Sequence, residues 1–83
     1  MIRVLLFASL RETLGTSQES VPLPTPATVG ALIGELRVRG ESWGQALATG
    51  KRWRVAVNQD MATLETPLCA GDEVAIFPPV TGG

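Results

Sequence analysis

Residues 70–83 read AGDEVAIFPPVTGG. The Gly71-Asp72 pair is typical of a tight turn, and the alternation of residues 73–77 after it predicts a short strand. Pro78 and Pro79 end that strand, because proline has a fixed φ and no N–H group to donate to a sheet. The stretch therefore predicts a core strand that stops abruptly and continues into a short tail.

The tail finishes in Gly82-Gly83. Glycine has no Cβ atom, so a carboxylate carried on Gly83 fits a narrow cleft. A tail that runs from residue 78 to residue 83 reaches roughly 20 Å when it is extended. We therefore divide the chain into one domain, residues 1–77, and a flexible C-terminal tail, residues 78–83.

The first residues of the chain predict a second apolar strand over residues 2–7. With a period of two, its core face carries Ile2, Val4 and Leu6. A short helix is expected over residues 8–14. Ser9 would cap this helix, with Glu12 at the capping-box spacing, and Gly15 would end it in a left-handed conformation.

The main helix is expected after Thr28, which is a good N-cap residue, and before Gly40. Apolar residues recur at i, i+3, i+4 and i+7 and form one stripe, which consists of Val29, Leu32, Ile33 and Leu36. Gly30 and Gly34 each cost about 1 kcal/mol relative to alanine. We interpret them as tolerated residues; the alternative is that another backbone approaches there.

Weaker patterns complete the order of elements. They predict an edge strand over residues 19–23, a helical turn over residues 42–48, a strand over residues 54–57 and a turn at Asn58. A right-handed crossover through the main helix places the first and last strands side by side and parallel. The predicted fold is α+β, of the β-grasp or ubiquitin-like type: a mixed four- to five-stranded sheet with one main helix packed on one face.

One helix covers only one face of such a sheet, so the other face is left open. Phe7 and Phe77 are expected there, with Leu5 beside them and Met61 near. Exposed apolar patches of this kind usually mark a protein partner. The alternative is that a loop folds over them.

The amino-acid composition argues against several classes of function. The chain has 83 residues, a net charge of −1 and no histidine, so imidazole catalysis, an ordinary zinc site and nucleic-acid binding are not expected. We interpret the basic run from Lys51 to Arg54 as a solvated rim, and Cys69 as a buried, inert core residue. No apolar run is long enough for a membrane span. A single cysteine suits the cytoplasm, which is the expected location.

The chain resembles the small subunits of molybdopterin synthase, which are ubiquitin-like sulfur carriers. The resemblance covers nearly the whole chain and rests on FASLRE at residues 7–12, GK at 50–51, AVNQ at 56–59 and, above all, residues 71–83. It implies that an E1-like partner uses ATP to adenylate Gly83, which then becomes a thiocarboxylate. It also implies that Gly82, which has no side chain, lets Gly83 enter both active sites.

The resemblance also implies that a large subunit, in a heterotetramer with this chain, receives the tail and moves the sulfur to a pyranopterin precursor. Its contacts would be with Phe7, Met61, Phe77, Pro78, Pro79, Val80 and Thr81. The acids, bases and phosphate contacts would all belong to the partners, so the chain itself needs no cofactor or metal and has no self-contained catalysis. The chain would therefore count as an enzyme only as the sulfur-donating subunit of the synthase, which is a sulfurtransferase.

Three alternatives stay open at this point. A sulfur carrier for thiamine synthesis shares the fold and the Gly-Gly end. A ubiquitin-like protein modifier would be conjugated to lysines through Gly83. A plain interaction domain would have a tail without a role.

Overall fold

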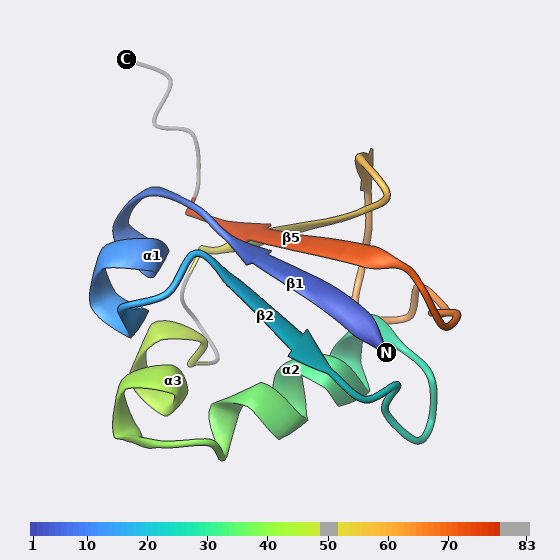
Figure 1. The fold of residues 1–83 in the computed structure, drawn as a ribbon, viewed down its shortest axis with the longest axis horizontal. Helices are drawn as coiled ribbons and strands as arrows, with labels where there is room; N and C mark the ends of the chain where they lie inside the picture. The colour runs from blue at the N-terminus through green and yellow to red at the C-terminus, as the bar shows by residue number, and fades with distance from the viewer. Residues whose placement is uncertain (49–51, 79–83) are drawn as a thin grey trace.

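A mixed sheet forms the frame of the protein, whose computed structural model describes residues 1–48 and 52–78 (Figure 1). Within these residues the strands are β1 (Ile2–Leu6), β2 (Gln18–Val21), β3 (Arg54–Val57), β4 (Asp60–Met61) and β5 (Glu73–Phe77), and their order in the sheet is β2-β1-β5-β3-β4. The central pair, β1 and β5, is parallel, and the other pairs are antiparallel. The predicted β-grasp fold, with its adjacent first and last strands, is confirmed.

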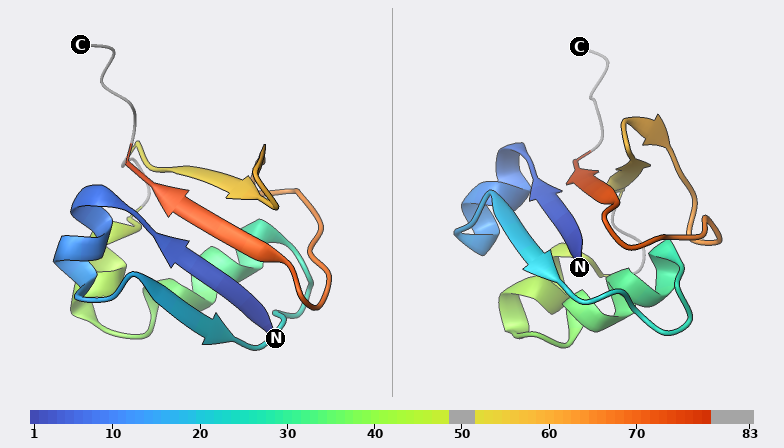
Figure 2. Two further views of the ribbon diagram at one scale, coloured as in Figure 1. Left: turned by 45° about the horizontal axis from the view of Figure 1, so that its top comes forward. Right: turned by 45° about the vertical axis from the view of Figure 1, so that its right-hand side comes forward.

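The helices lie to one side and at one end of this sheet. The main helix α2 (Val29–Arg37) and the shorter α3 (Glu41–Ala46) face the same side of it, whereas α1 (Ala8–Leu14) packs where β1 ends (Figures 1 and 2). The side of the sheet turned away from α2 and α3 carries no helix in the described part of the chain.

The core lies between the sheet and α2. The predicted stripe of α2 is buried in full, and so are the predicted core residues of β1. They meet the inward side chains of β5 and the end of α3; the residues in this set are Ile2, Val4, Leu6, Val29, Leu32, Ile33, Leu36, Leu47, Val74 and Ile76. Burial of one such aliphatic side chain contributes about 1.5–3 kcal/mol. The core therefore fixes which face of the sheet is left open.

The start of α1 differs from the prediction. Its N-cap is Phe7, which has an extended backbone, and no side chain caps the helix. The helix follows β1 without a connecting loop, so Ser9 already lies inside the first turn and cannot act as a cap. The predicted Ser9 cap is wrong. The predicted end is confirmed, because Gly15 has a φ of 72° and its N–H group donates to the Arg11 carbonyl at 2.9 Å.

The predicted boundaries of two further elements shift by a few residues. β2 begins at Gln18 and stops at Val21, because Pro22 cannot continue the hydrogen-bond ladder. α2 ends at Arg37, and Gly40 is the N-cap of α3 rather than the end of α2. The predicted Thr28 cap is confirmed by a hydrogen bond from the Ala31 N–H group to the Thr28 hydroxyl at 3.2 Å.

The two glycines of α2 have different surroundings. The N–H group of Gly30 donates to the Leu64 carbonyl at 2.8 Å, and a Cβ atom at Gly30 would lie 3.1 Å from the same oxygen. A Cβ atom at Gly34 would meet nothing within 4 Å. The interpretation as a tolerated residue therefore holds for Gly34 and is wrong for Gly30, where the loop after β4 reaches the helix.

Cys69 is exposed, and its predicted burial is wrong. Leu68 takes the core position, and Cys69 belongs to the turn that leads into β5.

The Asp72 carboxylate accepts hydrogen bonds from the Cys69 N–H group at 2.8 Å and from the Asn58 side-chain amide at 3.0 Å. These two bonds hold the pKa of Asp72 below its usual value.

Candidate functional site

The uncovered side of the sheet carries a continuous apolar row. Leu5 of β1 pairs with Ala75 of β5, Ala75 pairs with Ala56 of β3, and Ala56 pairs with Met61 of β4. Paired residues of neighbouring strands point to the same face, so all four lie on the face opposite α2. Met61 is exposed there, whereas only 8% of the surface of Ala56 is exposed. The two alanines form the middle of the row, and the larger side chains flank them.

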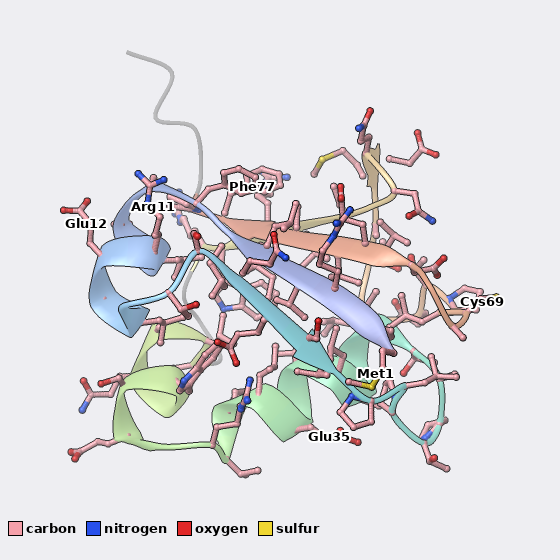
Figure 3. The ribbon with its side chains drawn as sticks, viewed as in Figure 1. Met1, Arg11, Glu12, Glu35, Cys69 and Phe77 are labelled. Atoms are coloured by element: carbon pink, nitrogen blue, oxygen red, sulfur yellow. The ribbon has the colours of Figure 1, made fainter. Side chains whose placement is uncertain are left out.

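Two aromatic residues continue this row towards the end of the sheet. Phe7 follows β1, its N–H group donates to the Ile76 carbonyl at 3.3 Å, and 45% of its surface is exposed. Phe77 is the last residue of β5 and points away from α2 and α3 (Figure 3). We call the set Leu5, Phe7, Ala56, Met61, Ala75 and Phe77 the open face. The structure thus brings together the residues that the sequence proposed for the patch, and the described residues place no helix over them.

The other end of the same side of the sheet is charged. The Arg3 guanidinium of β1 donates to the Glu73 carboxylate of β5 at 2.7 Å. A partly exposed ion pair of this type contributes about 0–1 kcal/mol to stability. This side of the sheet is thus charged at the start of β1 and β5, whereas their ends carry Phe7 and Phe77, and the exposed Arg54 of β3 is paired with Phe77.

The predicted tail begins at the aromatic end. β1 and β5 are parallel, so Phe7 and Phe77 lie at the same end of the sheet. Pro78, the first tail residue, is half-buried and borders a hollow of about 280 Å³ between α1 and α3. The remaining tail residues that the sequence proposed lie outside the described residues; they are Pro79, Val80, Thr81, Gly82 and Gly83.

The basic run lies next to the same end. Arg52 and Arg54 are exposed, whereas Trp53 is half-buried and packs against the core. Lys51 lies outside the described residues. Arg52 and Trp53 line the hollow beside Pro78. The two described arginines are thus solvated, as the sequence suggested.

The described residues offer little chemistry of their own. Among residues 1–48 and 52–78, no three potential metal-ligating side chains come together. The Cys69 thiol lies at the end of β5 opposite Phe77 (Figure 3). No helix in the described ranges is long and apolar enough to cross a membrane. What the structure does offer is an apolar surface next to Pro78, where the predicted tail begins.

Sequence reasoning missed Ala56 and Ala75 as members of this surface. Neither residue is conspicuous, but both fall on the alternate positions of their strands. The signal that identifies them is the register between β3 and β5, which sets Ala56 opposite Ala75. A further residue, Leu64, was expected only to lead back to the last strand, yet 53% of its surface is exposed.

Comparison with known proteins gives consistent matches over the full length of the chain. The sequence model of the ThiS family matches residues 4–83. The chain is 47% identical over 83 residues, 100% of both chains, to the molybdopterin synthase sulfur carrier subunit of Escherichia coli strain K12. It is 43% identical over 84 residues, again 100% of both chains, to the protein of the same name from Haemophilus influenzae.

Two further similarities bear on the alternatives. The chain is 39% identical over 87 residues to small archaeal modifier protein 1 of Haloferax volcanii, and the match covers 94% of this chain and 95% of the relative. Among solved structures, a Pyrococcus furiosus protein named after subunit 1 of molybdopterin converting factor has a TM-score of 0.79 at 29% identity, with 95% of this chain and 97% of that chain covered. Its similarity agrees with the β-grasp fold.

Proposed function

Since this chain belongs to the ThiS family, we propose that it is a sulfur carrier that acts as the small subunit of molybdopterin synthase. The observation that carries the proposal is its full-length similarity to the sulfur carrier subunits of that synthase. The open face supports it. A partner that binds over Phe7 and Phe77 is also next to the end of β5, from which the tail continues.

In the proposed reaction, Gly83 carries the sulfur. A free carboxylate is a poor electrophile, so its oxygen first attacks the α-phosphorus of ATP, and the bond to pyrophosphate breaks. Hydrosulfide supplied by a donor then attacks the carbonyl carbon of the acyl-adenylate, the bond to AMP breaks, and loss of the proton leaves a thiocarboxylate. The ATP and the groups that stabilise the phosphates belong to an E1-like activating partner.

The large subunit acts in the second half of the cycle. The thiocarboxylate sulfur attacks a carbon of the pyranopterin precursor and displaces an oxygen substituent, which leaves with a proton, and water then cleaves the bond between that sulfur and the Gly83 carbonyl. The sulfur stays on the product, and the carboxylate is regenerated. Gly82 has no side chain, so the segment next to Gly83 fits a narrow entrance to the active site. The rest of the tail contacts the partner in a heterotetramer; these contact residues are Pro78, Pro79, Val80 and Thr81.

A second candidate is a protein modifier that is conjugated to lysines through Gly83. The similarity to small archaeal modifier protein 1 favours it. Both candidates begin with the same activated carboxyl group, and they differ in the nucleophile that attacks it. A carrier for thiamine synthesis is a third outcome, because it would share the activation step.

An intact-mass measurement separates these candidates. The chain is incubated with an E1-like enzyme, ATP and a sulfur donor, and then with the large subunit and the pyranopterin precursor. A carrier gains the mass difference between sulfur and oxygen and returns to its first mass as dithiolene product forms. Adducts on other proteins identify a modifier, and a thiocarboxylate that is not consumed by the large subunit points to another pathway.

Two tail variants test the role of Gly83 itself. Gly83→Ala adds a methyl group beside the reacting carbon, and misplacement of a reacting atom by about 1 Å can cost roughly a hundredfold in rate. Deletion of Gly83 withdraws the carboxylate by about 3.5 Å and should be worse. Full synthase activity from the deletion variant would refute the carrier role.

A further inference from the structure

An apolar hollow lies at the edge of the sheet, beside the open face. It has a volume of about 410 Å³ and lies along β3, β4 and the residues that follow β4. We call it the edge pocket; its apolar walls are Trp53, Val55, Met61, Ala62 and Leu64. The two charged residues that border it, Arg54 and Glu65, have opposite signs. This lining favours an apolar side chain over a charged one. The charges of Arg54 and Glu65 cancel, so no net charge is left to compensate a charged group that is buried there.

The wall formed by Leu64 is held in place by its backbone. The Leu64 carbonyl accepts a hydrogen bond from the Gly30 N–H group at 2.8 Å. Two bonds close the turn around it: the Thr63 N–H group donates to the Thr66 hydroxyl at 2.9 Å, and the Thr66 N–H group donates to the Thr63 carbonyl at 3.2 Å. In the ribbon, the chain after β4 runs past the first turn of α2 (Figure 2).

This rigid turn displays an apolar side chain rather than burying it. The exposed fraction is 53% for Leu64 and 63% for Met61. Large exposed apolar side chains that lie together usually mark a binding surface, and a fixed backbone lowers the entropy cost of binding. Met61 belongs both to the open face and to the edge pocket, so the two surfaces are continuous.

The open face alone is small for a stable complex. Strands lie about 4.8 Å apart and rise about 3.3 Å per residue, so a five-stranded sheet with strands of at most five residues offers roughly 400 Å². A stable interface buries about 800 Å² on each partner. The tail supplies part of the difference. The edge pocket is apolar surface that adjoins the open face and can supply more of it.

We propose that the edge pocket receives an apolar side chain of the large subunit of molybdopterin synthase. The inference rests on the proposed function and extends it to a second contact, along the edge formed by β3 and β4. The large subunit is the occupant because Met61 joins the edge pocket to the open face, where the proposed function seats that subunit.

A matched pair of substitutions tests this contact. Leu64→Asp places a charge in the wall of the pocket, whereas Val38→Asp makes the same change at a residue that is 83% exposed and does not line the pocket. Binding to the large subunit of Escherichia coli molybdopterin synthase is measured by titration calorimetry, and thermal unfolding is recorded for both variants. We expect Leu64→Asp to weaken binding by at least about tenfold and Val38→Asp to change it by less than about twofold.

The outcomes distinguish this inference from the proposed function. If the unmodified chain does not bind the large subunit, both fail. If the unmodified chain and both variants bind equally, only the edge pocket is refuted. If Leu64→Asp loses activation by the E1-like enzyme but still binds the large subunit, the activating enzyme is the occupant and the inference is wrong. If Leu64→Asp unfolds, Leu64→Ala replaces it, and unchanged binding of that variant refutes the contact.

Discussion

The contact between α2 and the loop after β4 can be tested with the two glycines of α2. Gly34→Ala adds a methyl group in open space and should raise the free energy of unfolding by about 1 kcal/mol, the difference in helix propensity between the two residues. That gain corresponds to a rise of about 4–8 °C in Tm for a domain of this size.

Gly30→Ala offers the same gain in propensity but adds a steric conflict. The new Cβ atom would lie 3.1 Å from the Leu64 carbonyl oxygen, so the loop must move by a few tenths of an ångström. This movement strains the hydrogen bond from the Gly30 N–H group to that oxygen, now 2.8 Å long. A lost hydrogen bond costs about 0.5–1.5 kcal/mol, and overpacking costs about 1–3 kcal/mol. With the propensity gain subtracted, we therefore expect a net loss of about 0.5–3.5 kcal/mol.

The comparison depends on the difference in unfolding free energy between the two variants, which should be about 1.5–4.5 kcal/mol. Urea unfolding followed by tryptophan fluorescence measures it, because Trp43 and Trp53 both pack against the core. Helix propensity acts equally at both positions, so it cancels. If Gly30→Ala stabilised the protein as much as Gly34→Ala does, the loop would not be held against α2 as described.

Three other predictions follow from the core, the open face and the turn before β5. Leu36→Ala should lower the free energy of unfolding by about 2–5 kcal/mol, and unchanged thermal unfolding would mean that the stripe is not the core. Phe77→Ala should weaken binding of the large subunit by about 2 kcal/mol or more without loss of fold, which calorimetry and circular dichroism would check together. Because its hydrogen bonds lower the pKa of Asp72, the stability they provide should be present above the unfolded-state pKa and lost as the pH falls through the folded-state value. Asp72→Asn should therefore unfold more easily than the unmodified chain at neutral pH, with the difference shrinking in acid; a difference independent of pH would contradict this.

The fold could be predicted because its local patterns agree with one another. The stripe of α2 and the alternation of β1 and β5 each identify one buried face, and the right-handed crossover then leaves few ways to join them. The same patterns placed Phe7 and Phe77 on the side opposite the core. The parallel pairing of β1 and β5 puts Pro78, which follows β5, at the same end of the sheet as Phe7.

Other features depend on contacts that a local pattern does not contain. Gly30 looks like Gly34 in the sequence, and only the approach of the Leu64 carbonyl separates them. The Ser9 cap was wrong because the position of a cap depends on how directly the chain passes from strand to helix. Cys69 is exposed because the turn before β5 gives the core position to its neighbour, Leu68. The edge pocket likewise arises from a loop that packs on a distant helix.

The position of β5 in the middle of the sheet has a mechanical consequence. This strand is hydrogen-bonded to β1 on one side and to β3 on the other, and the tail continues directly from it. A pull on the tail along the strand loads both ladders in shear, so their bonds resist together instead of opening one after another. Tension on the end of the chain is thus shared by two ladders rather than carried by one. We expect the domain to withstand repeated pulling at this end without opening.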